Sequence, residues 1–400
     1  MKKISISQRA ADTPASATRK LVPLADAAKK RGIKVYHVNI GQPDLPTPEK
    51  IMNEIRNFKE STLSYAPSTG MLEAILAWQK FYQDKGITLE VNDILVTSGG
   101  SEGLIYAFFV VADPGDELIV FDPCYTSYAI IAAMGNIKLK PVRTYVNDGF
   151  HLPKRSVIEE AISKKTRGIV VCNPNNPTGT LYTPEEVKML KDIALKHNLF
   201  IISDETYQEI VFDGKKVLPF ASFKKLSQQL IIADSVSKRF NSCGARVGCV
   251  VSKNREVMQS ILRFAQSRLS VATVEQLALI PMLRNYRSYT ERIKKIYQSR
   301  RDTVVAELKK IPGVSCVEPE GAFYIIPKLP IDDSDKFAAF LLNEFSDKGE
   351  TVMVAPATGF YVTGGLGKNE IRIAYVLEEK KLERAMELLG LAIKKYNKTH

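Results

Sequence analysis

Short apolar runs alternate with longer segments of helical periodicity through the middle of the chain. Several of these runs are apolar on both faces, which is typical of strands buried between two helical layers. The segments between them carry helical signals, such as Thr183 as an N-cap with Pro184 at the first helical position. The pattern predicts an α/β fold with a largely parallel sheet. The predicted strands are Ile94–Thr97, Glu117–Phe121, Gly168–Cys172, Leu199–Ser203, Leu230–Ala233 and Val247–Val251.

The last hundred or so residues show a different order of elements. A long amphipathic helix is predicted from about Tyr289 to Lys310, and a terminal helix from about Glu378 to Tyr396. Between them lie two apolar runs, at 321–326 and 369–375, and a helix near 335–345. This mixture predicts a smaller α+β domain, with no low-complexity linker before it.

Polar residues follow three of the predicted strands. Asn173 and Asp204 each come directly after a predicted strand, and Ser235 comes two residues after the strand that ends at Ala233. The ligand crevice of an open α/β sheet lies at the carboxyl ends of its strands. We therefore expect these three residues to share one site.

Composition excludes several classes of protein. The 400 residues are 45% apolar, but no apolar run is long enough for a transmembrane helix, and residues 1–9 lack the apolar core of a secretory signal. The net charge of +12 is spread along the chain, which argues against a nucleic-acid-binding face. The five cysteines form no Cys-x-x-Cys pair, so neither a disulfide framework nor a zinc site is predicted. A cytoplasmic protein with no membrane or nucleic-acid partner and no metal is the expectation.

Lys238 is the central candidate for chemistry. It lies in Ser235-Val236-Ser237-Lys238 after the run that ends at Ala233. A lone Ser-x-x-Lys would indicate a surface lysine. Together with the other motifs of the chain, however, it predicts a lysine that binds pyridoxal 5'-phosphate (PLP) as a Schiff base. Asp204 would keep the pyridine nitrogen of PLP protonated, although such an aspartate is also common as a helix N-cap.

Two further residues would donate hydrogen bonds to the phenolate oxygen of PLP. These are Tyr207 and Asn176. Asn176 lies in the segment Asn173–Gly179, which has more Asn-Pro and Thr-Gly steps than a turn requires. Asn176–Pro177 is a candidate cis peptide bond.

The phosphate of PLP would lie against a glycine-rich turn. Gly99-Gly100-Ser101-Glu102-Gly103 follows a predicted strand and begins a helix, whose N-terminal N–H groups attract anions. Gly100, Ser101 and Glu102 are the candidate contacts, and Ser235 and Arg246 would complete the cradle. Tyr125 would lie against the ring, although core packing explains this tyrosine nearly as well.

Arg372 is the candidate ligand for a substrate carboxylate. The planar guanidinium matches a carboxylate in a bidentate manner. Ile371-Arg372-Ile373-Ala374 places the arginine opposite an apolar face, so a surface ion pair is the alternative.

Taken together, these residues resemble the class I aminotransferases of PLP fold type I, and most resemble the aspartate aminotransferase branch. The similarity extends over nearly the whole chain. The segments that carry it are Asn39–Asp44, Tyr65–Gly70, Asn173–Gly179, Asp204–Tyr207, Ser235–Lys238, Arg246, Glu320–Tyr324 and Arg372.

The resemblance implies a particular architecture. Residues 47–285 would form a large PLP-binding domain around a mostly parallel seven-stranded sheet, and residues 286–400 a small domain joined by segment 1–46. The protein would be a homodimer with active sites at the subunit interface. Tyr65 would reach the phosphate of the cofactor bound to the other subunit. The backbone of Gly41 would lie near the substrate carboxylate, and Tyr324 would contact substrate.

The resemblance also bears on substrate choice. Aspartate-type enzymes need a cation for the side-chain carboxylate of the substrate. One bacterial subgroup has a lysine just after the glycine pair, where this chain has Ser101-Glu102. Arg268 is the candidate here, and Arg19 is a further one.

The predicted activity is a ping-pong transamination through a Lys238 aldimine. An L-amino acid, with aspartate as the first expectation, would donate its amino group to 2-oxoglutarate, and Lys238 would act as general base. An aromatic or other neutral amino donor remains open. So does a carbon–sulfur lyase of the same fold type. A PLP-binding regulator is disfavoured because about 45 residues before the large domain are too few for a helix-turn-helix module.

Overall fold

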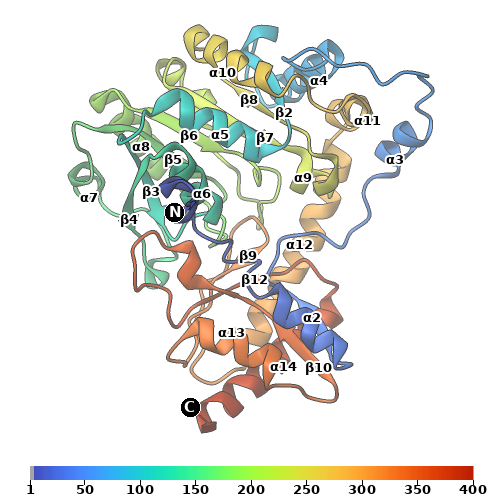
Figure 1. Ribbon diagram of the computed structural model, residues 1–400, viewed down its shortest axis with the longest axis vertical. Coiled ribbons are helices and arrows are strands. Elements are labelled where there is room, and N and C mark those ends of the chain that lie inside the picture. Colours follow the sequence, from blue (N-terminus) through green and yellow to red (C-terminus); the bar gives the residue numbers. More distant parts are fainter. Residues whose placement is uncertain (1–3, 400) are drawn as a thin grey trace.

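The computed structural model describes residues 4–399 and contains a large α/β part and a smaller α+β part (Figure 1). A seven-stranded, mainly parallel sheet lies at the centre of the large part, which confirms the predicted fold class. In spatial order its strands are β2 (Ile94–Thr97), β8 (Gly248–Val251), β7 (Leu230–Ser235), β6 (Phe200–Asp204), β5 (Thr166–Cys172), β3 (Glu117–Asp122) and β4 (Lys138–Arg143).

Strand β8 alone opposes its neighbours, pairing antiparallel with β2 and β7. The other adjacent pairs are parallel, so β5, β6 and β7 end at the same edge of the sheet. In this register Cys172 pairs with Asp204. The carboxyl ends of three neighbouring strands therefore meet where the polar residues were predicted to gather.

Both faces of the sheet are covered by helices. Along β6, Ile201 belongs to one apolar core and Ile202 to the other, because successive strand residues point to opposite faces. Residues of α5 (Gly100–Val111), α6 (Thr126–Gly135) and α10 (Arg255–Ser267) pack in the core of Ile202. Those of α4 (Leu72–Gln83), α8 (Pro184–His197), α11 (Thr273–Arg284) and α12 (Arg287–Leu308) pack in the core of Ile201.

The smaller part combines a segment from near the start of the chain, with α2 and β1, and the C-terminal segment (Figure 1). Strand β1 (Lys34–His37) pairs in parallel with β10 (Glu350–Met353), and β12 (Ile371–Ala374) lies between β9 (Tyr324–Ile325) and β11 (Ala355–Pro356). Helices α2 (Val22–Lys30), α13 (Ser334–Asn343) and α14 (Glu379–Thr399) pack around these strands. The remaining helices are α1 (Gln8–Asp12), α3 (Glu49–Arg56), α7 (Arg155–Glu160) and α9 (Val236–Arg239).

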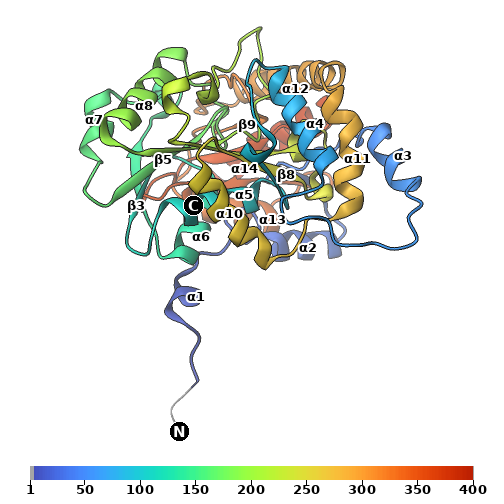
Figure 2. The same cartoon turned by 90° about the horizontal axis from the view of Figure 1, so that it is seen from above.

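The first described residues extend away from the body of the molecule. Figure 2 shows α1 on an arm that projects beyond α6. On this arm Ile4 is almost fully exposed to solvent and Ile6 is largely exposed. Within residues 4–399, no helix has both the length and the hydrophobicity that spanning a membrane would require.

In the large part, two details differ from the sequence predictions. Strand β4 was not predicted, because Lys138, Lys140 and Arg143 interrupt its apolar pattern at the exposed edge of the sheet. The expectation of a cis bond at Asn176–Pro177 is wrong, since the cis bonds precede Pro123 and Pro174. The turn that holds Asn176 is closed by a hydrogen bond from the N–H of Gly179 to the carbonyl of Asn175.

Candidate active site

A cavity of about 120 Å³ lies at the carboxyl edge of β5, β6 and β7. Asp204 ends β6 and Ser235 ends β7, while Asn176 lies in the turn that follows β5. The parallel strands thus bring together residues that are far apart in the sequence. The cavity is lined by Gly100, Ser101, Leu104, Tyr125, Asn176, Asp204, Thr206, Tyr207, Ser235, Ser237, Lys238, Cys243 and Arg246.

Lys238 is presented by the short helix α9. Ser235 caps this helix, because its Oγ accepts a hydrogen bond from the N–H of Ser237 at 3.1 Å. The Nζ of Lys238 donates to the carbonyl of Gly41 at 2.7 Å and lies 3.3 Å from the Sγ of Cys243. Gly41 follows β1 in the chain, so the amine of the large part contacts a segment joined to the smaller part.

Asp204 is buried beneath the cavity and has three donors. The hydroxyl of Tyr128 donates to Oδ2 at 2.9 Å, and Thr206 donates to Oδ1 from its hydroxyl at 2.6 Å and its N–H at 3.2 Å. Burial raises the pKa of Asp204, and these hydrogen bonds oppose that shift. A cationic N–H at the open side of this carboxylate would favour its ionised form, as a pyridinium nitrogen does.

Two tyrosines form a buried hydrogen-bonded pair on the other side of the cavity. The hydroxyls of Tyr207 and Tyr324 are 2.8 Å apart. Burial raises the pKa of Tyr207, so this phenol stays protonated and can donate a hydrogen bond. Tyr125 lies at the cavity wall with its ring edge-on to Tyr128, at a centroid distance of 5.6 Å.

The glycine-rich turn lies against Arg246. Gly99 adopts φ +81° before α5, and a Cβ there would come within 2.7 Å of Nη2 of Arg246. The guanidinium donates to the carbonyls of Ser98 and Cys243, each at 3.2 Å. Because first-turn N–H groups of a helix lack intrahelical partners, α5 and Arg246 together form a site for an anion.

Arg372 is a buried cation without a carboxylate partner among the described residues. Its exposure is 3%, and it donates to Oδ1 of Asn176 at 3.1 Å and to the carbonyl of Asn39 at 2.6 Å. Its guanidinium lies over the rings of Tyr324 and Phe360, while Nε has no partner. Burial lowers the pKa of Arg372, so an incoming carboxylate would relieve an uncompensated charge.

Three predicted residues, Gly41, Tyr324 and Arg372, adjoin the cavity through hydrogen bonds to residues that line it. Three others, Glu102, Arg268 and Tyr65, are not part of its lining. Glu102 faces away and forms a salt bridge with Arg268, whose Nε lies 3.0 Å from its carboxylate. Arg268 also donates to the carbonyls of Ser68 and Val96, which hold it against β2 and the segment before α4. Tyr65 is 79% exposed on a loop and contacts none of the cavity residues just described.

Four polar residues that line or support the cavity were not predicted from sequence. Tyr128 and Thr206 hold the carboxylate of Asp204, and Ser237 and Cys243 flank Lys238. Thr206 lies within the segment Asp204–Tyr207, and Cys243 lies between Lys238 and Arg246, so sequence proximity was the only available signal. Tyr128 had none, because its contact joins α6 to β6 across 76 residues.

The residues in this cavity suit PLP. An amine, a buried carboxylate, a protonated phenol and an anion site are the groups that its aldehyde, pyridine nitrogen, phenolate and phosphate require. The unpartnered Nε of buried Arg372 beside Asn176 adds a place for a second anionic group. The donor set therefore fits the cofactor and a carboxylate-bearing substrate together.

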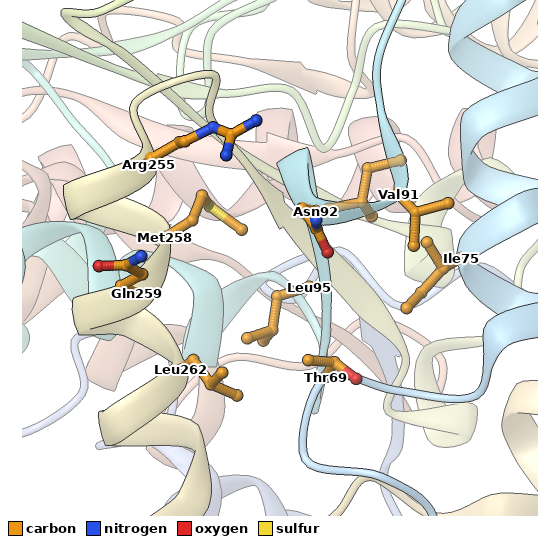
Figure 3. A pocket seen from close by; sticks show the side chains of 10 residues that line it. Thr69, Ile75, Val91, Asn92, Leu95, Arg255, Met258, Gln259 and Leu262 are labelled. Carbon is orange, nitrogen blue, oxygen red and sulfur yellow. The ribbon is translucent and has the colours of Figure 1, made fainter.

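A second hollow lies elsewhere on the large part, between α10 and β2 (Figure 3). Its volume is about 300 Å³, and its walls are mainly apolar, with Leu95 and Met258 as examples. Arg255 is the only ionisable residue in this lining and is paired across 4.0 Å with Glu90. Although this hollow is larger, it lacks an acid, a base and a nucleophile, so the chemistry belongs to the cavity of Lys238.

Comparisons with known proteins agree with this site. Residues 33–389 match the family described as "Aminotransferase class I and II". The chain is 36% identical to an aspartate aminotransferase of Pyrococcus horikoshii, over 90% of each chain. It is 30% identical to aromatic-amino-acid aminotransferase 2 of Thermococcus litoralis, over 98% of this chain and 99% of that one.

Solved structures show the same similarity. The aspartate aminotransferase of Thermus thermophilus with maleate superposes with a TM-score of 0.88 and 28% identity, covering 98% of this chain and 100% of that one. An alanine aminotransferase from Pyrococcus furiosus gives a TM-score of 0.89 and 30% identity, with the same coverage. The similarity thus spans the whole arrangement that builds the cavity.

Proposed function

Because this chain belongs to the aminotransferase class I and II family and is therefore a transaminase, we propose that it transfers the amino group of an L-amino acid to 2-oxoglutarate. Aspartate is the donor we propose first, since several of its relatives are named aspartate aminotransferases. The family uses PLP, and the residues around Lys238 fit that cofactor.

The observation that carries this proposal is the environment of Arg372. A guanidinium with 3% exposure and no acidic partner among the described residues is costly unless an anion binds there. It donates to Asn176, which also lines the cavity of Lys238. A substrate whose α-carboxylate binds Arg372 would therefore bring its Cα close to the amine. This supports a reaction at the α-carbon of an amino acid.

The chain's residues divide the work of the reaction. PLP, when bound, supplies an electron sink for the negative charge that develops at the substrate Cα. Lys238 would move the proton between this carbon and the cofactor, acting as general base and then as general acid. Arg372 would hold the substrate so that the bond that breaks faces Lys238 and lies perpendicular to the ring.

The remaining residues would tune this chemistry. Asp204 would keep a proton on the pyridine nitrogen, because a carboxylate at close range favours the protonated ring. Tyr207 and Asn176 would donate to the phenolate oxygen. Arg246, Ser235 and the first turn of α5 would hold the phosphate and so fix the position of the ring against Tyr125.

Preference for aspartate requires a cation for the side-chain carboxylate. Arg268 is engaged by Glu102, so we favour Arg19 for this role. Arg19 is exposed and directly follows Thr18, whose carbonyl accepts a hydrogen bond from Asn39. The carbonyl of Asn39 in turn accepts from Arg372, so the segment of Arg19 adjoins the carboxylate site.

A neutral or aromatic donor is the second candidate. The salt bridge between Arg268 and Glu102 favours such a donor. Arg268 was the first candidate for a side-chain carboxylate, and in the structure Glu102 is already bound to it. The aromatic rings of Tyr324 and Phe360 beside Arg372 also suit an apolar side chain. The relative from Thermococcus litoralis is named for aromatic amino acids.

A homodimer is part of the proposal. Tyr65 is 79% exposed, and Leu63 on the same loop is 69% exposed. Large exposed apolar side chains on one loop are typical of an interface. We propose that Tyr65 reaches the phosphate of the cofactor in the partner subunit, and light scattering on the purified protein would test the assembly.

A half-reaction screen tests the function. The protein loaded with PLP is mixed with aspartate, glutamate, tyrosine, phenylalanine or alanine, and the visible absorbance of the bound cofactor is followed. Aspartate should bleach this band fastest, with oxaloacetate as the product. Formation of pyruvate and ammonia without a 2-oxo acid acceptor would instead identify a carbon–sulfur lyase and overturn the proposal.

A further inference from the structure

Cys243 occupies a junction in the active site that the transamination scheme leaves unused. It begins the short 3₁₀ turn Cys243–Ala245 and lines the cavity. Its Sγ lies 3.3 Å from the amine of Lys238, and its carbonyl accepts a hydrogen bond from Arg246 at 3.2 Å. One residue thus touches both the reactive lysine and the arginine at the phosphate end.

The thiol has a defined orientation. Its Sγ donates to the carbonyl of Ser237 at 3.4 Å. A thiol has one hydrogen, so the sulfur can only accept in its contact with Lys238. The amine therefore has two acceptors, the carbonyl oxygen of Gly41 at 2.7 Å and the sulfur of Cys243 at 3.3 Å.

The number of acceptors around the amine determines where its lone pair can point when Lys238 acts as a base. A neutral amine has two N–H donors and one lone pair. If Gly41 and Cys243 take the two N–H groups, the lone pair must point away from both of them, into the cavity. We propose that Cys243 is a positioning residue that, with Gly41, aims the lone pair of Lys238 at the α-proton of the substrate. This inference rests on the proposed transamination.

The alternative is that Cys243 only shapes the turn before Arg246. Its backbone carbonyl would then be important and its sulfur replaceable. Two substitutions of Cys243 distinguish a role of its sulfur from a role of its backbone carbonyl. Cys243→Ser keeps a side-chain donor and acceptor of similar size, whereas Cys243→Ala keeps the backbone and removes the acceptor. Cys316→Ala, a half-exposed cysteine in the smaller part, is the matched control.

The first measurement uses the protein without cofactor. An amine-reactive acylating reagent is applied at pH 7, and labelling of Lys238 is quantified by peptide mass spectrometry. Loss of the sulfur acceptor releases one N–H of Lys238 from its hydrogen bond, so the amine is less restrained and should react faster. Lys238 in Cys243→Ala should label about three- to tenfold faster than in the native chain, the range expected for one hydrogen bond. Cys243→Ser and Cys316→Ala should match the native chain.

The second measurement uses the loaded protein in single-turnover half-reactions. With an α-deuterated amino acid, Cys243→Ala should show slower proton transfer, by about three- to tenfold, and a larger isotope effect. Cys243→Ser should restore both values. Equal labelling and equal isotope effects in Cys243→Ala and Cys316→Ala would overturn the inference. If no amino acid reacts with the native chain, the proposed function fails, and labelling alone decides whether the thiol holds the amine.

Discussion

Arg239 and Asp234 form a buried salt bridge behind the reactive lysine, with a shortest N–O distance of 2.8 Å. Asp234 lies on β7 and Arg239 ends α9, so the pair ties the helix of Lys238 to the central sheet. The guanidinium also lies 4.2 Å from the ring centroid of Phe81 on α4. The position of Lys238 therefore depends on charges on the opposite face of the sheet from Asp204.

Breaking this salt bridge should destabilise the fold. Arg239→Met leaves Asp234 buried without its partner, and we expect a loss of about 3–5 kcal/mol in the free energy of unfolding. Arg255→Met is the control, because its pair with Glu90 is exposed and its loss should cost less than about 1 kcal/mol. Urea denaturation measures both. Combining Asp234→Asn with Arg239→Met should recover part of the loss; a fully additive loss would contradict the pairing.

Glu205 should make stability depend on pH. The side chain of Glu205 is 1% exposed. Burial is the main cause, and the nearby Asp234 the second, that raises the pKa of Glu205 to about 8. Lys85 and Arg239 oppose the shift. The folded chain thus keeps a proton that the unfolded chain releases near the ordinary pKa of 4.5. The free-energy cost of keeping this proton in the folded state grows as the pH rises from about 4.5 to about 8, so the native chain loses stability over this range.

Glu205→Gln removes this titration and keeps the shape of the protonated acid. We expect the variant to gain stability relative to the native chain steadily between pH 5 and pH 8. Urea denaturation of both chains across this range measures the difference, in which the contributions of the other titrating groups cancel. A stability difference that does not change with pH would show that Glu205 is ionised in the folded protein.

Asp204 and its neighbour Glu205 offer a matched comparison of function. Asp204→Asn removes the carboxylate from the cavity, whereas Glu205 points to the opposite core. We expect Asp204→Asn to lower kcat by about 100-fold or more, because each pKa unit of lost stabilisation costs about tenfold. Glu205→Gln should retain kcat within about threefold. Steady-state kinetics with the best donor checks this, and equal losses in the two variants would remove Asp204 from the cofactor site.

Arg372 should control affinity for every amino acid, whatever its side chain. Arg372→Lys keeps a cation but loses the bidentate fork, and we expect kcat/KM to fall by about 100-fold for all donors. Arg263→Lys, on the exposed face of α10, is the control. A loss restricted to aspartate and glutamate would instead place Arg372 at the side-chain carboxylate.

Arg19 and Arg268 should differ in their effect on specificity. If Arg19 binds the side-chain carboxylate, Arg19→Ala lowers kcat/KM for aspartate by about tenfold or more and leaves alanine within about twofold. Arg268→Ala breaks the salt bridge with Glu102 and should affect all donors alike. Competition assays between aspartate and alanine measure the ratio directly, and a selective effect of Arg268→Ala alone would reverse the assignment.

Much of the fold was predictable because its signals are local. The apolar runs placed six strands of the large sheet, and Thr183 with Pro184 marked the start of α8. Strand β4 was not predicted, because an edge strand tolerates Lys138, Lys140 and Pro141. Its apolar content is too low for periodicity to reveal it.

The site was predictable where chemistry follows the ends of strands, as at Asp204 and Ser235. It was not predictable where the contact joins two segments that are far apart in the sequence. The salt bridge of Arg268 with Glu102 spans 166 residues, and nothing in either local sequence indicates it. The hydrogen bond from Tyr128 to Asp204 is of the same kind. Such contacts depend on how α5, α6 and α10 pack, which the pattern of a single sequence does not specify.

The identity of the reactive lysine is open to a direct measurement. The chain loaded with PLP is reduced with borohydride, digested and analysed by mass spectrometry for the lysine that retains the cofactor. We predict that the cofactor is attached to Lys238 and that Lys238→Ala abolishes both attachment and transamination. Attachment to a different lysine, or normal turnover by Lys238→Ala, would contradict the proposed active site.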